Sequence, residues 1–164
     1  MEEDHQTLIA QLLDAAKAAG ADGADAMLAR GQSTNINLRL GNVEAIERSE
    51  DYDVGLRVFF GQRTASISTS QLDDENIRSL ADRAVAMAKL APEDPFVRLA
   101  TDDEISKFIP DLDIFDNTVP GTDRLKDRAA AAEEAALSHS GIKTSDGADA
   151  GHGVVDVVIG TSNG

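Results

Sequence analysis

The chain has 164 residues, no cysteine, and twice as many acidic as basic side chains, which gives a formal net charge of −15. The lack of cysteine excludes disulfide bonds and thiolate metal sites, and the negative field repels phosphate backbones and anionic lipid. No stretch approaches the roughly 18 apolar residues of a membrane span, and the acidic start, MEEDHQ, differs from the basic start of a signal peptide. We therefore expect a soluble, cytoplasmic protein that binds neither membrane nor nucleic acid directly.

A helix is predicted over residues 7–19, because apolar side chains recur there at intervals of three and four. Asp4 is the expected N-cap, and Gly20 suits the left-handed conformation that ends many helices. The apolar stripe consists of Leu8, Ile9, Leu12, Leu13, Ala16 and Ala19. A short strand over residues 24–29, ended by Gly31, is expected next.

The first of two predicted β-hairpins follows. Residues 35–40 alternate polar and apolar side chains with a period of two, as a half-buried strand does. Gly41 and Asn42 have the Gly-first pattern of a two-residue hairpin turn. Folding at that turn pairs Arg39 with Glu44 across the two strands, and opposite charges in such a position are favourable.

The second predicted hairpin turns at Gly61 and Gln62 and joins residues 54–60 to residues 63–70. Its apolar face carries Val54, Leu56, Val58, Phe60, Ala65 and Ile67. Its opposite face carries Arg57, Phe59, Thr64, Ser66 and Ser68. One apolar and one mostly polar face are typical of an antiparallel sheet that is covered on one side.

A second helix is predicted to begin at Asp73, which caps it, and to stop at Pro92. Leu72 and Ile77 are expected to form a hydrophobic staple at its start. Its apolar stripe consists of Ile77, Leu80, Ala81, Ala84 and Ala88. The sequence thus predicts an α+β fold, a mostly antiparallel β-sheet built from hairpins with helices packed on one face.

The second half of the chain has weaker patterns. Prolines interrupt residues 96–121, which are predicted to be an irregular connector that wraps the domain. A third helix is predicted over residues 123–139, with a stripe of Leu125, Ala129, Ala132 and Ala136. The tail DGADAGHG is expected to be a hairpin or a flexible turn, and VVDVVIG is expected to be a buried strand. We divide the chain at residues 1–95, 96–121 and 122–164, and expect the last part to continue into a C-terminal domain, because TSNG has turn chemistry.

No catalytic, cofactor-binding or metal-binding residue is predicted. His5, His139 and His152 lack partners at ligand spacing, and the acids around residues 111–116 lack the Gly and the oxygen spacing of a calcium loop. The serines of the second hairpin have no nearby base to activate them. The candidate surface is the polar sheet face, where Arg57, Thr64, Ser66 and Ser68 would face a peptide or a partner protein. A free sheet edge could bind an extended peptide by strand addition, or the connector could cover that edge.

The motifs as a whole resemble one known family. The segments LRLGNVEAIE, GLRVFFGQRTASIST, AKLAPEDP, LDIFD and the closing TSNG are similar to the N-terminal domain of the TldD/PmbA proteins, the "modulator of DNA gyrase" metallopeptidase family. AKLAPEDP and LDIFD resemble the PmbA (TldE) branch more than the TldD branch. The resemblance implies a cytoplasmic complex of two related subunits that degrades peptides, a homo- or hetero-dimer with zinc only in the TldD-type subunit. The family's metal motif lies beyond the N-terminal domain, so no ligand is assigned here. The alternative is a free-standing protein- or peptide-interaction module without protease function.

Overall fold

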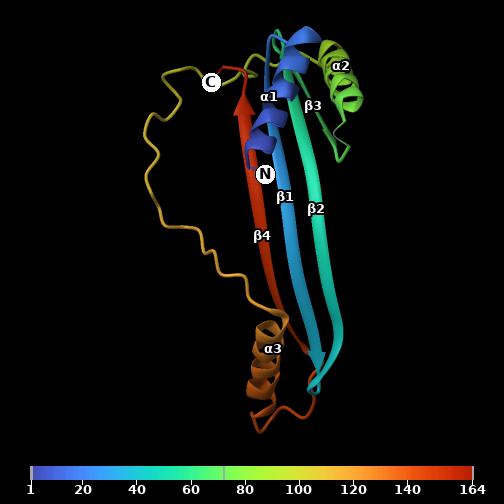
Figure 1. Cartoon of the computed structure of the whole chain (residues 1–164), viewed down its shortest axis with the longest axis vertical. Coiled ribbons are helices and arrows are strands. Elements are labelled where there is room, and N and C mark those ends of the chain that lie inside the picture. Colours follow the sequence, from blue (N-terminus) through green and yellow to red (C-terminus); the bar gives the residue numbers. More distant parts are fainter. Residues whose placement is uncertain (1, 72, 164) are drawn as a thin grey trace. The chain divides into compact units, whose positions relative to one another are not determined.

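A computed structural model describes residues 2–71 and 73–163. Its elements are α1 (Glu2–Ala18), β1 (Gly23–Arg39), β2 (Asn42–Phe60), β3 (Arg63–Thr69), α2 (Asp74–Leu90), α3 (Thr122–Leu137) and β4 (Ala148–Thr161). The four strands form one sheet in the order β3-β2-β1-β4 (Figure 1). The predicted α+β class is confirmed. No helix of the described residues has the length and apolar character that crossing a membrane requires.

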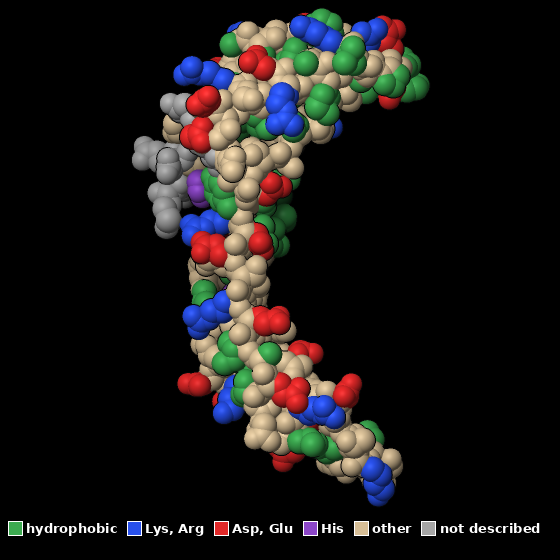
Figure 2. Space-filling model, turned by 90° about the vertical axis from the view of Figure 1, so that its right-hand side faces the viewer, with side chains coloured by type: hydrophobic (Ala, Val, Ile, Leu, Met, Phe, Trp, Pro, Cys, Tyr) green, Lys and Arg blue, Asp and Glu red, His purple; other side chains and the backbone are tan. Residues whose placement is uncertain are grey.

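The chain divides into two compact units. The first unit comprises Met1–Arg30, Tyr52–Asp111 and Asp156–Gly164, and the second comprises Gly31–Asp51 and Leu112–Val155. In Figure 2, the visible face mixes acidic, basic and apolar side chains without a large area of one sign. Acidic and basic side chains are therefore interspersed on that face.

The core of the first unit lies between the two N-terminal helices and one face of the sheet. Apolar side chains of α1 and α2 pack there against alternate residues of β1 and β2. The helix residues are Ile9, Leu12, Ala16, Ile77, Leu80, Ala81, Ala84, Val85 and Ala88, and the strand residues are Ala24, Ala26, Leu28, Val54, Leu56 and Val58. Both predicted helix stripes and the predicted apolar face of the second hairpin meet in this core. Burial of one such large side chain stabilises the fold by roughly 1.5–3 kcal/mol.

The ends of these helices follow capping rules, with one correction. Gly20 has a positive φ of 97°, and the N–H of Ala21 donates to the carbonyl of Ala16 at 3.0 Å, which completes a Schellman motif. Asp73 caps α2 as predicted by accepting the N–H of Asn76 at 2.9 Å. Leu72, the predicted staple partner, lies outside the described residues. The expected N-cap at residue 4 is wrong, because α1 already begins at Glu2.

The β2–β3 hairpin has the predicted register. Leu56 lies opposite Ile67, and Arg57 lies opposite Ser66. The turn is at residues 61–62, and Gly61 has a positive φ of 57°, which the first position of a type II′ turn requires. The turn and the alternation of side chains therefore agree.

The predicted turn of the first hairpin is wrong by one residue. The loop is Leu40–Gly41, and both residues have positive φ angles of 47° and 76°, as a type I′ turn requires. A two-residue loop there brings Arg39 beside Asn42 instead of the predicted Glu44. The cross-strand charge pair is therefore not formed, and Arg39 instead lies 3.9 Å from the carboxylate of Asp146. β1 also continues through Gly31, where the sequence predicted its end.

The second unit has a small core under α3. Its fully buried large side chains are Ile36 and Leu38 of β1 and Leu125 of α3. The buried stripe of α3 continues from Leu125 through Ala129 to Glu133 at intervals of four residues, and not through the predicted Ala132 and Ala136, which are exposed.

Two further predictions for the second half of the chain are wrong. The predicted buried strand is the edge strand β4, and Val155, Val157 and Ile159 are exposed because only one face of the strand packs. The predicted hairpin or flexible turn at residues 146–153 is also wrong for most of its length, because β4 begins at Ala148. The connector is irregular, and its residues 100–119 are all exposed.

Candidate functional site

The candidate site is the sheet face of the first unit that the helices leave uncovered, called here the open face. Successive side chains of a strand point to opposite faces, so the residues between the core positions lie on this face. They surround a shallow hollow of about 730 Å³. Its lining includes Asp25 and Met27 of β1, Gly55 and Arg57 of β2, Ser66 and Ser68 of β3, and Ile159 and Thr161 of β4.

An ion pair between Arg57 and Asp25 lies on the open face and lines the hollow. Arg57 Nε donates to the two carboxylate oxygens of Asp25 at 3.1 and 3.0 Å, and Arg57 Nη2 also donates to Asp25. The hydrogen bonds to Asp25 raise the pKa of Arg57. The guanidinium also lies 5.2 Å from the centre of the Phe59 ring, within the range of a cation–π contact. The pair is therefore preorganised, and it presents polar atoms without net charge.

The structure places three of the four sequence-predicted residues together. Arg57, Ser66 and Ser68 line the hollow. Thr64 is not among the lining residues, and its hydroxyl donates to the carbonyl of Val58 at 2.9 Å. The hairpin register explains this, because Thr64 lies opposite Phe59, beyond the Arg57–Ser66 pair.

Several lining residues were missed by sequence reasoning. Asp25 and Met27 come from β1, and Ile159 and Thr161 come from β4, which ends more than 130 residues further along the chain. The alternation within each strand indicates which face a residue occupies. It does not indicate which strands are neighbours, so these residues could not be joined to Arg57 from the sequence.

The outer edge of β4 borders the open face. Within the described residues no strand pairs with that edge, since β4 is last in the sheet order. The N–H of Ser162 donates to the carbonyl of Ala24 on β1 at 2.8 Å. Backbone N–H groups alternate between the two edges of an antiparallel strand, so the N–H groups of Val157 and Ile159 point away from β1. These two side chains are 50% and 66% exposed. The edge therefore offers backbone donors next to apolar side chains.

The described residues gather no group of three or more His, Asp or Glu side chains that could hold a metal ion. They therefore do not fit the zinc that the resemblance assigns to the TldD-type subunit. The hydroxyls of Ser66 and Ser68 lie in the hollow beside Asp25 and Arg57, without a histidine among the lining residues. The arrangement is suited to holding a ligand by hydrogen bonds and apolar contact.

Comparison with known proteins identifies related sequences. Residues 24–88 match the family model described as PmbA/TldA metallopeptidase domain 1. A metalloprotease PmbA homolog of Haemophilus influenzae is 28% identical over 136 residues, which is 83% of this chain and 30% of that protein. Metalloprotease PmbA of Escherichia coli O157:H7 is 29% identical over 116 residues, 71% of this chain and 26% of that protein.

Solved structures show the same fold. A proposed modulator of DNA gyrase from Bacteroides thetaiotaomicron has a TM-score of 0.88 at 22% identity, covering 98% of this chain and 37% of that one. TldE from Thermococcus kodakarensis has a TM-score of 0.73 at 15% identity, covering 96% and 35%. The predicted resemblance to the TldD/PmbA family is confirmed. The chain spans about a third or less of the length of these relatives.

Proposed function

We propose that this chain, whose residues 24–88 carry the first-domain pattern of the PmbA/TldD metallopeptidase family, is the N-terminal, non-catalytic domain of a PmbA-like subunit. The subunit would belong to a cytoplasmic complex that degrades peptides, as a homo- or hetero-dimer with a TldD/PmbA-type subunit. The role of the domain is to hold an extended peptide and to contact the partner subunit. The names of the curated relatives, both metalloprotease PmbA proteins, support the proteolytic context.

The observation that carries this proposal is the unpaired edge of β4 beside the open face. An extended peptide that adds to a sheet edge gains main-chain hydrogen bonds, and its alternate side chains enter neighbouring pockets. Val157 and Ile159 supply the outward N–H groups. Ile159 and Met27 line the hollow as apolar surface, and the fixed Arg57–Asp25 pair supplies polar atoms.

Bond cleavage is assigned to a zinc site outside residues 1–164, in the TldD-type subunit. We place it there because the described residues assemble no group of three or more side chains that could bind a metal ion. No histidine lines the hollow beside these hydroxyls, and the nearby carboxylate of Asp25 is hydrogen-bonded by Arg57, so no described group is arranged to activate a serine as a nucleophile. The chain's own contribution would then be to bind and orient the peptide.

The test is a substitution that removes one backbone N–H from the outer edge of β4 and leaves the hydrogen bonds between β4 and β1 in place. Val157→Pro does this, because proline lacks an N–H and is tolerated where that N–H faces solvent at a sheet edge. The matched control is Val157→Thr, which keeps the N–H and the branched shape. The probe is a fluorescent, C-terminally amidated peptide of alternating valine and threonine with a lysine at each end.

The proposal predicts that Val157→Pro weakens the anisotropy-measured affinity about tenfold, as expected for losing one good hydrogen bond. Val157→Thr should bind like the parent chain, and both variants should melt within a few degrees of it. Equal affinity of all three proteins would contradict peptide holding by this edge. Binding of peptide without association with a purified TldD-type subunit would instead favour the free-standing interaction module.

A further inference from the structure

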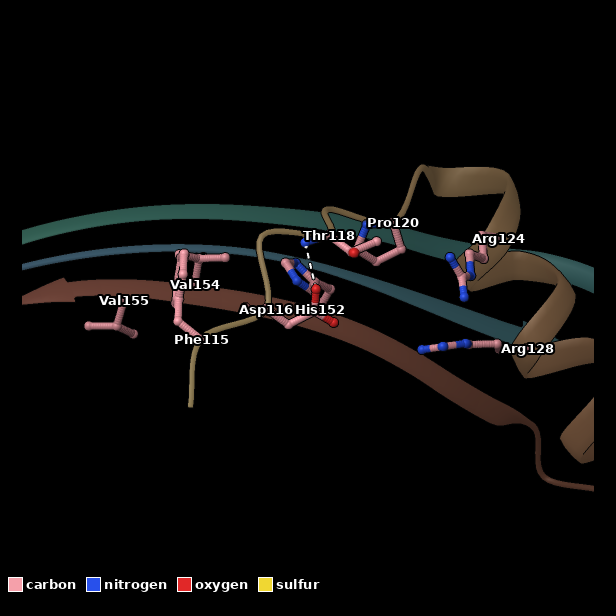
Figure 3. A pocket seen from close by; sticks show the side chains of 10 residues that line it. Phe115, Asp116, Thr118, Pro120, Arg124, Arg128, His152, Val154 and Val155 are labelled. Atoms are coloured by element: carbon pink, nitrogen blue, oxygen red, sulfur yellow. Dashed lines mark hydrogen bonds between the residues drawn. The ribbon is translucent and has the colours of Figure 1, made fainter. Parts of the chain in front are cut away.

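A second hollow, with a different character, lies entirely within the second unit. It has a volume of about 440 Å³ and is formed by the end of the connector, the start of α3 and part of β4. Its charged or titratable lining residues are Asp116, Arg124, Arg128 and His152. In Figure 3, the side chains of Arg124 and Arg128 extend from α3 toward Asp116 and His152.

The two arginines make no hydrogen bond or close ion pair of their own among the described residues, although the charge of Arg124 contributes to the lowered pKa of Asp116. They are four residues apart on α3 and therefore lie on the same side of the helix. Neither guanidinium has a hydrogen-bond or ion-pair partner among the described residues. Four other arginines, Arg39, Arg57, Arg63 and Arg98, do pair with acids. The chain has two acidic residues for every basic one, so acidic partners are abundant. Arg124 also lies in the first turn of α3, where the helix dipole disfavours a cation. Helix stability therefore does not explain why Arg124 is there.

The one acid in the hollow is already engaged. Asp116 accepts the backbone N–H of Thr118 at 2.8 Å, and the hydrogen bonds from Thr118 lower the pKa of Asp116. One carboxylate faces two guanidinium groups, so the hollow keeps an excess of positive charge. Guanidinium groups bind carboxylates and phosphates with paired N–H donors. The hollow therefore has the chemistry of an anion site.

The hollow also has an apolar part. Phe115 and Val155 are each 63% exposed, and Figure 3 shows both away from the arginines, at the other end of the hollow. A small inorganic anion would leave this surface uncovered. A ligand with a carboxylate beside an apolar side chain would use both ends.

We propose that this hollow binds a peptide carboxylate, with Arg124 and Arg128 on the carboxylate and Phe115 and Val155 against a neighbouring apolar side chain. The carboxylate can be that of a peptide C-terminus or of an acidic side chain. The inference goes beyond the holding of a peptide backbone by β4 and does not depend on it, since no residue is shared between the two sites.

Isothermal titration of the 164-residue chain tests the proposal with three probes. They are acetyl-Ala-Phe with a free carboxylate, the same dipeptide as its C-terminal amide, and acetyl-Glu-Phe-amide, which carries only a side-chain carboxylate. At least one of the two carboxylate probes should bind about tenfold more tightly than the amide. Which of them binds better identifies the source of the carboxylate.

The variants are Arg124→Gln and Arg128→Gln, and each should weaken binding of that carboxylate probe about tenfold. The matched control is Lys126→Gln, which removes the same charge from α3 at a position that does not line the hollow. Two residues from either arginine, Lys126 points to another side of the helix, so its variant should bind like the parent chain.

Three results would overturn the proposal. The first is equal affinity for the carboxylate and amide probes. The second is a loss of affinity in Lys126→Gln as large as that in the arginine variants. The third is binding of inorganic phosphate by a chain that binds neither carboxylate probe. Circular dichroism confirms that each variant is folded. The Val157→Pro variant should bind the carboxylate probes normally, so failure of this site and failure of the β4 edge are distinguishable.

Discussion

The carboxylate of Glu133, on α3, accepts the backbone N–H of Leu40 at 2.8 Å. The other carboxylate oxygen accepts the N–H of Gly41 at 3.0 Å. Glu133 is 4% exposed, and both residues of the turn have positive φ angles. One side chain therefore joins the helix of the second unit to the tight turn between β1 and β2.

This contact predicts an acid-sensitive stability. The hydrogen bonds from Leu40 and Gly41 lower the pKa of Glu133 below its ordinary value of 4.5. Because the folded pKa is the lower one, the stabilisation is fully present above the unfolded value and is lost as pH falls through the folded value. Glu133→Gln should lower the melting temperature at pH 7, and the difference from the parent chain should shrink below pH 4.5.

Glu134→Gln is the control for that measurement, because Glu134 is the exposed neighbour on the same helix. It removes the same charge and should leave the melting temperature at pH 7 nearly unchanged. A difference between Glu133→Gln and the parent chain that stays constant from pH 7 to pH 3 would contradict the role of the ionised carboxylate.

Leu125 is the one large apolar side chain that α3 buries completely. Leu125→Ala should therefore cost about 2–5 kcal/mol, the usual range for such a truncation. Hydrogen exchange of α3 and of the Leu40–Gly41 turn should become faster, while α1 and α2, in the other core, keep their protection. Unchanged exchange in α3 would show that another contact holds the helix.

Gly160 marks a close approach between β4 and α1. A Cβ atom at Gly160 would overlap Ile9 Cγ2 and would lie 3.4 Å from Leu13 Cδ1. Gly160→Ala should destabilise the fold by about 1–3 kcal/mol, as overpacking usually does. Gly55→Ala is the control, since nothing lies within 4 Å of a Cβ there. Denaturant unfolding should separate the two variants, and equal midpoints would contradict the packing of β4 on α1.

The ion pair of the open face should matter little for stability. The side chains of Arg57 and Asp25 are 51% and 20% exposed, and exposed pairs typically contribute about 0.2–1 kcal/mol. A double-mutant cycle with Asp25→Asn and Arg57→Gln should give a coupling free energy in that range. A coupling of several kcal/mol would show that the pair is a structural element instead of a binding surface.

Local rules predicted the parts of the fold that local chemistry decides. The turn at Gly61, the cap at Asp73 and the Schellman glycine Gly20 all depend on residues within one turn of each other, and all three are confirmed. The first hairpin failed because Leu40 adopts a positive φ, a conformation that bulky side chains rarely adopt. Glu133, far along the chain, binds the two N–H groups of that turn and helps to hold it.

Long-range relations could not be predicted. Arg57 was placed on the polar face from the alternation of one hairpin, but its partner Asp25 depends on how β1 lies beside β2. The exposure of Val157 and Ile159 depends on β4 being the last strand of the sheet, and an apolar run is equally typical of a buried strand. The hollow of Arg124 and Arg128 combines three segments, and no short motif marks it.

The central claim is that this chain holds an extended peptide at a sheet edge. Hydrogen exchange along β4 is the most direct test of that claim. Without peptide, the amides of Asp156 and Val158, which point to β1, should be protected, and those of Val157 and Ile159 should exchange quickly. With the amidated valine–threonine peptide bound, the amides of Val157 and Ile159 should slow by about tenfold or more, since opening must then break the added strand. Unchanged exchange of these two amides in a chain saturated with peptide would contradict the account.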